Sequence, residues 1–290
     1  MPAATGSPVS FVCCGVRVDG LTLGEAVRRV VDLSRAGRGA AVHLCNAYTL
    51  SLARRDPALA DALNAGDLNL ADGAPLFEVG RRLRRPPPSR GQRPRGADLL
   101  VAVVDAGRAS GLRHYLYGAS ESTLAALAEQ LVGRCPGAVI AGTESPPYRP
   151  LSAGEEQEAI ERIRAARPDV VWVGLGTPRQ DQVVHRLREH VEVTFLAVGA
   201  AFDFVAGTRR QAPVWMRRAG LEWLHRFAAE PRRLARRYLV GNVLFVAGLL
   251  RDGVVVVGDA GPEDAAGAPA GDGGQSRGGG DDAGAGPPDS

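Results

Sequence analysis

Two short polar segments combine residue types that could act on a phosphorylated ligand. Asp72 and Gly73 follow the apolar run Asp67–Leu70, so a carboxylate stands just past a predicted strand. A carboxylate placed there can accept the proton of an attacking hydroxyl group, and the glycine would let a substrate approach the backbone. An Asp-Gly pair is also common in ordinary turns, which is the stronger interpretation on local sequence alone.

The second segment is the loop GLGTPRQ, Gly174–Gln180. It joins the run Val170–Val173 to a helix predicted to begin near Pro178, where proline is well tolerated. The N–H groups at a helix start bind phosphate and Gln180 could add an amide contact, although a tight turn explains the loop equally well. Arg179 stands where a third glycine would complete the dinucleotide-binding fingerprint, which argues against an NAD-dependent oxidoreductase.

The elements that must hold these segments alternate along the chain. The predicted strands are Val12–Val18, Ala41–Leu44, Asp67–Leu70, His114–Tyr117, Ala138–Ala141, Val170–Val173 and Val193–Val198. The predicted helices are Leu23–Ala36, Leu50–Ala62, Leu99–Ala109, Ser122–Val132, Ala153–Ala166 and Gln180–His190. This alternation predicts an α/β fold, with a mostly parallel sheet covered by helices on both faces.

Polar and glycine residues gather just after the predicted strands. Asn46, Asp72, Gly118, Gly174 and Asp203 each follow one of these runs. In an open α/β sheet the carboxyl ends of the strands form the ligand crevice. The sequence therefore predicts a nucleotide-like ligand at this edge.

Two arginine-rich segments interrupt the pattern. Residues 81–95 contain too many prolines and charges for a helix or a central strand, which predicts a mobile loop. Residues 206–238 hold nine arginines against Glu222 and Glu230, interleaved with aromatic residues. This second segment can be a solvated helical face, a surface for anionic lipid and diphosphate, or a nucleic-acid patch. Nucleic acid ranks last because no recognition module is found.

Composition divides the chain into three parts. We expect a catalytic core over residues 1–205, a helical arginine- and aromatic-rich appendage over 206–258, and a disordered acidic tail over 259–290, which is almost without large apolar residues. The formal charge of +3 becomes +9 when the tail, with seven acids and one arginine, is left out. A basic folded part suits anionic partners.

Cysteines, histidines and apolar runs narrow the setting. The four cysteines form no C-x-x-C pair, which predicts buried thiols in a reducing compartment, and His185 and His190 lack a metal-binding pattern. No signal peptide is recognised at the start. The longest apolar run, Leu239–Leu250, has 12 residues. A bilayer crossing needs about 20 residues, so we expect a cytoplasmic protein that does not cross the membrane.

Taken in order, these segments resemble the WecG/TagA/CpsF family of bacterial glycosyltransferases from about residue 12 to residue 250. The matching residues are Asn46, Ala71-Asp72-Gly73, an R-x-x-G-x-D-L pattern (Arg93, Gly96, Asp98, Leu99), Tyr117-Gly118, Pro146-Pro147-Tyr148, G-x-P-x-Q (Gly176, Pro178, Gln180), Val198–Gly207, AP-x-W (Ala212, Pro213, Trp215) and Gly220–Tyr238. Each piece is short, but their succession is specific, and it favours Asp72 as a catalytic residue over the plain turn.

The resemblance implies a Rossmann-like core and an inverting, metal-independent reaction without a cofactor. A sugar of the N-acetylmannosamine type or a related hexose would pass from a UDP-sugar to a polyprenyl-diphosphate-linked acceptor, in the synthesis of a cell-surface polysaccharide or teichoic-acid-like polymer. The enzyme would lie on the inner face of the membrane, and self-association into a homo-oligomer is compatible with the sequence.

Roles for individual residues follow from the same resemblance and from the strand-end crevice. Asp72 would be the base. The residues expected to hold the donor are Asn46, Gly73, Arg93, Asp98, Gly118, Gly174, Gly176, Pro178, Gln180 and Asp203. The arginines expected to face the acceptor or the leaving diphosphate are Arg226, Arg233 and Arg237, where they would neutralise developing charge as a metal does elsewhere.

Three positions depart from the family pattern. Leu44 replaces a frequent threonine two residues before Asn46, Gln211 replaces the arginine of an R-A-P motif, and Asp181 replaces a glutamate. Because the threonine hydroxyl is missing, the sequence does not identify which donor sugar is bound. The departures at 44 and 211 also motivate an alternative, a non-catalytic homologue that binds nucleotide sugars at the membrane surface.

Overall fold

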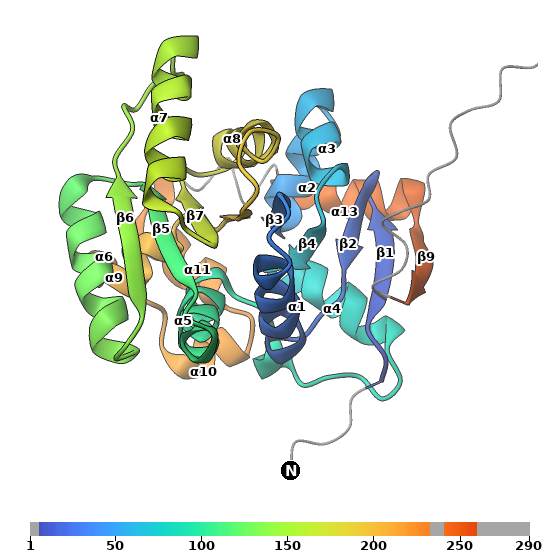
Figure 1. The fold of residues 1–290 in the computed structure, drawn as a ribbon. Helices are drawn as coiled ribbons and strands as arrows, with labels where there is room; N and C mark the ends of the chain where they lie inside the picture. The colour runs from blue at the N-terminus through green and yellow to red at the C-terminus, as the bar shows by residue number, and fades with distance from the viewer. Residues whose placement is uncertain (1–5, 233–240, 260–290) are drawn as a thin grey trace, which may run out of the picture. The chain divides into compact units, whose positions relative to one another are not determined.

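The structure, a computed structural model, describes residues 6–232 and 241–259. Within them lies one mixed sheet of nine strands in the order β6-β5-β7-β8-β3-β4-β2-β1-β9 (Figure 1). The strands are β1 Val9–Cys13, β2 Val16–Asp19, β3 Ala40–Cys45, β4 Leu68–Ala71, β5 Arg113–Gly118, β6 Val139–Glu144, β7 Val170–Gly174, β8 Thr194–Ala197 and β9 Val254–Asp259. The strands from β6 to β2 pair in parallel, and β1 pairs antiparallel with both β2 and β9.

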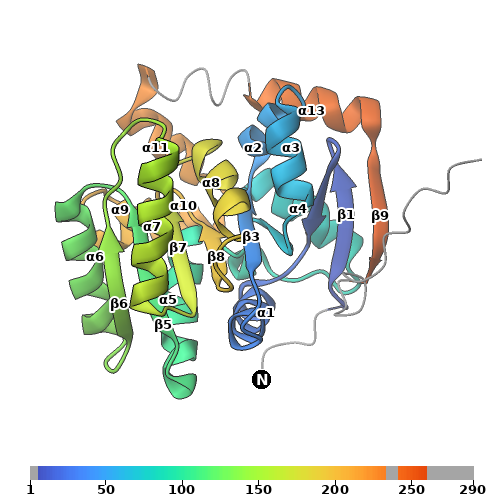
Figure 2. The same ribbon diagram turned by 45° about the horizontal axis from the view of Figure 1, so that its top comes forward.

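Helices cover both faces of this sheet (Figure 2). They are α1 Leu23–Arg35, α2 Ala47–Ala53, α3 Pro57–Asn64, α4 Ala74–Leu83, α5 Gly96–Gly107, α6 Glu121–Arg134, α7 Ala153–Ala166, α8 Arg179–Leu187, α9 Ala201–Ala206, α10 Val214–Arg218, α11 Glu222–Ala229 and α13 Gly241–Asp252, with short 3-10 turns at Arg90–Gln92 and Arg108–Ser110. The predicted α/β class, the mostly parallel sheet and a helical C-terminal segment are confirmed.

Alternation along the central strands explains the two covered faces. In β7, Val170 and Trp172 join one apolar cluster with α1, α5, α6 and α9, whereas Val171 and Val173 join another with α7 and α8. A third cluster packs β1 and β2 against α2, α3, α4 and α13. Central strands with both faces buried read as continuous apolar runs, which is why the sequence located them well.

The parallel register brings the strand ends to one edge. Leu44 pairs with Leu70, Cys45 with Ala71, and Val173 with Ala197. The residues that follow β3, β4, β7 and β8 therefore lie at the same edge of the sheet. This edge is the one at which a ligand crevice was predicted.

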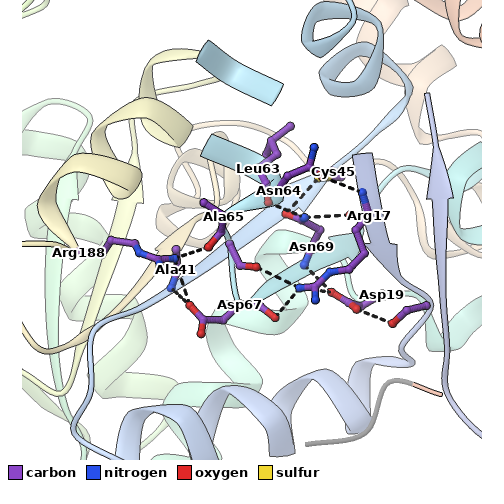
Figure 3. A network of polar contacts seen from close by, with 12 residues as sticks. Arg17, Asp19, Ala41, Cys45, Leu63, Asn64, Ala65, Asp67, Asn69 and Arg188 are labelled. Carbon is purple, nitrogen blue, oxygen red and sulfur yellow. Dashed lines mark hydrogen bonds and ion pairs between the residues drawn. The ribbon is translucent and has the colours of Figure 1, made fainter. Parts of the chain in front are cut away.

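The opposite ends of β3 and β4 are fixed by a polar network (Figure 3). Asp67 accepts hydrogen bonds from the Ala41 N–H at 2.9 Å and from Arg188 at 3.3 Å, which ties the start of β4 to β3 and to the segment after α8. Buried Asn69 donates to the carbonyls of Arg17 and Leu63 at 2.9 and 2.8 Å. These contacts satisfy buried polar groups and hold the strands in register.

Two predicted elements prove to be two elements each. The strand predicted over 12–18 is a hairpin, because Cys14 and Gly15 form its turn at φ 54° and 78°. The helix predicted over 50–62 breaks at Asp56, which caps α3 by accepting from the Leu59 N–H at 3.2 Å, ahead of Pro57. Proline suits the first turn of a helix but not its interior.

Other predictions missed elements that pack onto the core. Helix α4 was not predicted, although it buries Leu76 and Phe77. Strand β9 was not predicted either; it extends the sheet beyond β1 from within the segment expected to be helical, and it ends at Asp259, the first residue of the predicted tail. The rest of that tail, 260–290, lies outside the described residues.

The segment 81–95 is largely irregular, as expected, but it is not loose. The Arg84 side chain is fully buried and pairs with Glu25 at 2.7 Å, and Arg93 and Arg95 are also buried. The expectation of a mobile loop is therefore wrong, because each of these guanidinium groups meets a carboxylate inside the fold. The charge pattern predicted solvent exposure and could not show these partners.

Candidate active site

A cleft of about 1170 Å³ opens at the carboxyl ends of the central strands. Eight of the residues predicted for the site line it, namely Asn46, Asp72, Gly174, Gly176, Pro178, Gln180, Asp203 and Arg226. They come from the ends of β3, β4 and β7, from the start of α8, from α9 and from α11. The structure thus brings together side chains that are up to 180 residues apart in the sequence.

Asp72 lies between the end of β4 and the start of α5. Its Oδ1 accepts a hydrogen bond from the N–H of Gly96, the first residue of α5, at 3.1 Å. Burial raises the pKa of the Asp72 carboxyl, and the negative Glu222 adds to the rise, while Arg93, the Gly96 N–H and Arg95 oppose it. A carboxylate with a raised pKa is a stronger base than an exposed aspartate.

Asp72 also differs from the other acids in the cleft wall. Asp203 pairs with Arg209 at 3.4 Å, and Glu222 pairs with Arg95 at 2.9 Å. Within the described residues, no arginine or histidine lies within ion-pair distance of Asp72. Among the acids that line the cleft in the described residues, Asp72 is therefore the one whose carboxylate forms no ion pair.

Asn46 and Gly73 hold the turns after β3 and β4 together. Asn46 caps α2, its Oδ1 accepting from the N–H groups of Tyr48 and Thr49 at 3.1 and 3.2 Å. A Cβ on Gly73 would lie 2.7 Å from the Asn46 Cβ. Gly73 is thus required by the close approach of Asn46, in addition to any approach of a substrate, and it does not itself line the cleft.

The loop Gly174–Gln180 is braced by its own last residue. Gln180 is buried, and its Oε1 accepts from the Gly176 N–H at 2.9 Å. Gly176 has φ 81°, and a Cβ on Gly174 would lie 2.6 Å from the Phe202 ring. The loop therefore has a fixed shape in which glycine is needed twice. Helix α8 begins at Arg179, directly after Pro178, close to the predicted start.

Arg93, Asp98 and Gly118 stand behind the cleft wall rather than in it. Arg93 approaches Glu222 at 3.3 Å, and Asp98 accepts from Arg95 at 2.8 Å. A Cβ on Gly118, which has φ 122°, would lie 2.7 Å from the Gly174 backbone, so this glycine lets β5 and β7 end side by side. In this structure these three residues shape the surroundings of the cleft.

The C-terminal segment contributes directly to the cleft. The Arg226 guanidinium lies over the Phe204 ring, 5.4 Å from its centroid, and both residues line the cleft with Arg209. Arg233 and Arg237, predicted to face the same site, lie outside the described residues. Leu44 also lies in the cleft wall, so the departure from threonine falls where substrate would be contacted.

Several cleft residues were not predicted from the sequence as site residues. Among the described lining residues, six arginines face three acids: Arg55, Arg95, Arg149, Arg179, Arg209 and Arg226 against Asp72, Asp203 and Glu222. Glu222 belongs to the quoted Gly220–Tyr238 match, so a signal for it was present. Arg179 donates to the carbonyls of Pro147 and Arg149 at 2.8 and 2.6 Å, which places that loop at the rim. An excess of arginine suits a diphosphate.

Comparison with known proteins identifies the family of the chain. The model of the glycosyl transferase WecG/TagA/CpsF family matches residues 11–256. The chain belongs to this family. It is therefore a glycosyltransferase, and the interpretation as an oxidoreductase is set aside.

Two proteins similar to this chain are named N-acetylglucosaminyldiphosphoundecaprenol N-acetyl-beta-D-mannosaminyltransferase. The protein from Bacillus spizizenii is 29% identical over 185 residues, covering 63% of this chain and 69% of its own length. The protein from Bacillus subtilis is 27% identical over 199 residues, covering 68% and 75%. The family resemblance given by the ordered motifs is confirmed.

Three further observations concern metals, membranes and the cysteines. In the part of the chain that the structure describes, no group of three or more histidine, cysteine or acidic residues is placed to hold a metal ion. Across residues 6–232 and 241–259, no helix combines the length and apolar character needed to cross a membrane. The four cysteines are buried thiols without a disulfide, as predicted.

Proposed function

We propose that this glycosyltransferase moves an N-acetylmannosamine-type hexose from a UDP-sugar to a polyprenyl-diphosphate-linked sugar, with inversion and without a metal ion. The activity for which the two relatives are named supports the acceptor class and the sugar. The observation that carries the proposal here is Asp72, a carboxylate of raised pKa in an arginine-rich cleft that forms no ion pair with any residue the structure describes.

Asp72 would act as general base in a single displacement. The acceptor hydroxyl oxygen forms a bond to the anomeric carbon while its proton passes to the Asp72 carboxylate, and the bond from the anomeric carbon to the β-phosphate oxygen breaks. UDP leaves with that electron pair. Attack on the face opposite the leaving group inverts the anomeric centre.

The leaving diphosphate would be met by arginines and by backbone N–H groups. Arg226 and Arg209 line the cleft on the C-terminal side, and the loop Gly174–Gln180 lines it on the core side. Positive groups held in a partly buried site stabilise charge that develops in the transition state. This arrangement supports transfer without a metal ion, which stays a proposal.

The acceptor would enter from a membrane surface beside the C-terminal segment. Val243, Val246 and Leu250 are 67%, 51% and 83% exposed and lie at spacings of three and four on α13, so they form one apolar stripe. An exposed apolar helix face near basic residues suits the headgroup region of an anionic bilayer. This supports peripheral association with the inner membrane face in the synthesis of a cell-surface polymer.

The activity is tested by incubating the full chain with a panel of UDP-sugars and a short polyprenyl-diphosphate-linked N-acetylglucosamine, and by detecting the product by mass spectrometry. We expect transfer from UDP-N-acetylmannosamine or a close relative, with and without EDTA. UDP binding without transfer across the panel, in folded protein, would instead support a non-catalytic homologue.

The base assignment is tested by Asp72→Asn. We expect turnover to fall by about 10²–10⁴-fold, because the amide cannot accept the proton, while UDP binding measured by calorimetry is kept. Asp105→Asn is the matched control, since Asp105 is exposed and pairs with Arg108 outside the cleft. Unchanged turnover in Asp72→Asn would remove Asp72 from this role.

A further inference from the structure

Glu222 is a partly buried acid of the cleft to which the proposed reaction gives no task. It is the first residue of α11, in the C-terminal segment, and its side chain is 18% exposed. Arg95 donates to both of its carboxylate oxygens, from Nε at 2.9 Å and from Nη2 at 3.1 Å. Arg93 Nη2 lies 3.3 Å from the same carboxylate. A bidentate pair of this kind fixes both partners.

These two arginines also act electrostatically on Asp72. Arg93 and Arg95 both lower the pKa of the Asp72 carboxyl, whereas Glu222 raises it. Arg93 and Arg95 are 6% and 7% exposed, so water screens their charges little. If Glu222 were neutral, no negative charge from Glu222 would oppose the effect of the two guanidinium groups on Asp72, and only burial would keep its pKa raised.

The other groups around Asp72 do not replace Glu222. The α5 N-terminus faces Asp72 through the Gly96 N–H and stabilises its ionised form, as do the arginines. From β3, the Cys45 thiol lies close enough for Asp72 to contribute to its raised pKa. Asp98 accepts a hydrogen bond from Nη1 of Arg95, and Arg226 acts on Glu222 from α11. Among the described residues, Glu222 is thus the acid that contacts both arginines and also raises the pKa of Asp72.

We infer that Glu222 is a positioning residue that holds Arg93 and Arg95 away from Asp72 and thereby keeps Asp72 basic enough to accept the acceptor's proton. Because Glu222 belongs to α11, the base reaches its working state only when this segment is docked on the core. The inference rests on the proposed role of Asp72 as base.

The test is the pH dependence of kcat/KM, in full-length protein, for Glu222→Gln, which keeps the shape and removes the charge. Removing a negative neighbour favours the ionised form of Asp72 and lowers its pKa. We therefore expect the acidic limb of the profile to move to lower pH by about 0.5–1 unit, and the plateau rate to fall as the base weakens. Glu156→Gln is the matched control, because Glu156 pairs with Arg186 at the surface, and its profile should not move.

Two further variants keep the inference testable if Glu222→Gln folds poorly. Arg93→Gln removes a charge that lowers the Asp72 pKa, so its acidic limb should move the opposite way, to higher pH. Glu222→Asp keeps the charge, so the acidic limb of its profile should stay close to the wild-type position. A loss of activity in Glu222→Gln with an unmoved limb would overturn the inference and leave Glu222 a purely structural residue.

Failure of the inference is distinguishable from failure of the proposed function. If Asp72→Asn retains wild-type turnover, Asp72 is not the base, whatever Glu222→Gln does. If Asp72→Asn loses turnover but Glu222 and Arg93 variants leave the limb in place, the base assignment stands and the role of Glu222 falls.

Discussion

Asp72 is placed by glycines on both sides of it. The N–H of Gly96 donates a hydrogen bond to Asp72. A Cβ on Gly96 would lie 3.1 Å from Leu44 and 3.3 Å from Ala201. Gly73 allows Asn46 to pack against the turn that carries Asp72. The short spacing between backbone segments, more than any special backbone angle, explains glycine at these two positions.

Gly73→Ala should therefore damage the site. The new Cβ would lie 2.7 Å from the Asn46 Cβ and 2.9 Å from its Cα, so backbone must shift. We expect a loss of about 1–3 kcal/mol in the free energy of unfolding and a fall in turnover, because Asp72 moves with the turn. Urea unfolding and the transfer assay measure the two effects.

Gly133→Ala is the control for this substitution. Gly133 lies inside α6 with no atom within 4 Å of an added Cβ, and alanine favours helix. Its stability should stay equal or rise by about 0.5–1 kcal/mol, with unchanged turnover. A Gly73→Ala variant that behaves like this control would show that the packing of Asn46 on Gly73 does not matter.

The sequence predicted that Asp72, Asn46 and Gln180 lie at the cleft, because each follows a recognisable strand within a few residues. It did not assign Glu222, although the residue belongs to a matched motif. Glu222 pairs with Arg93 and Arg95. Both arginines stand more than 120 residues earlier, in a segment predicted to be a mobile loop. Pairing of charges across such a distance depends on tertiary packing, which local patterns do not contain.

Among the elements, β3 and α8 are joined by a buried polar contact. His43 Nδ1 lies 2.9 Å from Asp181 Oδ1, and both side chains are fully buried. Asp181 follows Gln180, and His43 lies three residues before Asn46, so the contact links the two halves of the cleft. Among the described residues, His43 Nε2 and Asp181 Oδ2 have no hydrogen-bond partner, which leaves the pair dependent on this single contact.

We expect Asp181→Ala to lower the free energy of unfolding by about 1–3 kcal/mol, because His43 would lose its buried partner. The KM for the UDP-sugar should rise more than kcat falls, since the loop braced by Gln180 would shift. Denaturant unfolding and steady-state kinetics measure these effects. Asp181→Asn keeps an acceptor oxygen and is the matched control; an equal defect in both variants would argue that charge, not the hydrogen bond, holds the helix.

The elements that the sequence predicted well include a strand buried on both faces and a helix with a capping box at Ser152 and Glu155. Val170–Val173 and Ala153–Ala166 were located within a residue of β7 and α7. The misses have local causes: a two-residue turn at Cys14-Gly15 and a cap at Asp56. Strand β9 forms only because the β1 edge is available for pairing, a property of the assembled sheet.

For the whole molecule, charge is divided unevenly along the chain. Residues 260–290 carry six acids and one arginine, a formal charge of −5, so residues 1–259 carry +8 against +3 for the full chain. The segment follows directly on β9, close in sequence to the exposed apolar stripe of α13. An acidic segment tethered there would weaken the attraction of the basic part for an anionic bilayer.

A chain ending at Asp259 should therefore bind vesicles containing anionic lipid more tightly than the full chain, by about fivefold or more at low ionic strength. The gain should shrink as salt is added, because charge screening weakens both the attraction and its inhibition by the acids. Binding is measured by vesicle sedimentation, with neutral phosphatidylcholine vesicles as the reference. A full-length variant with the six acids changed to Asn or Gln separates charge from length: it should bind as the shortened chain does. Equal binding by all three proteins would mean that the apolar stripe, and not the charge balance, sets the affinity for the membrane.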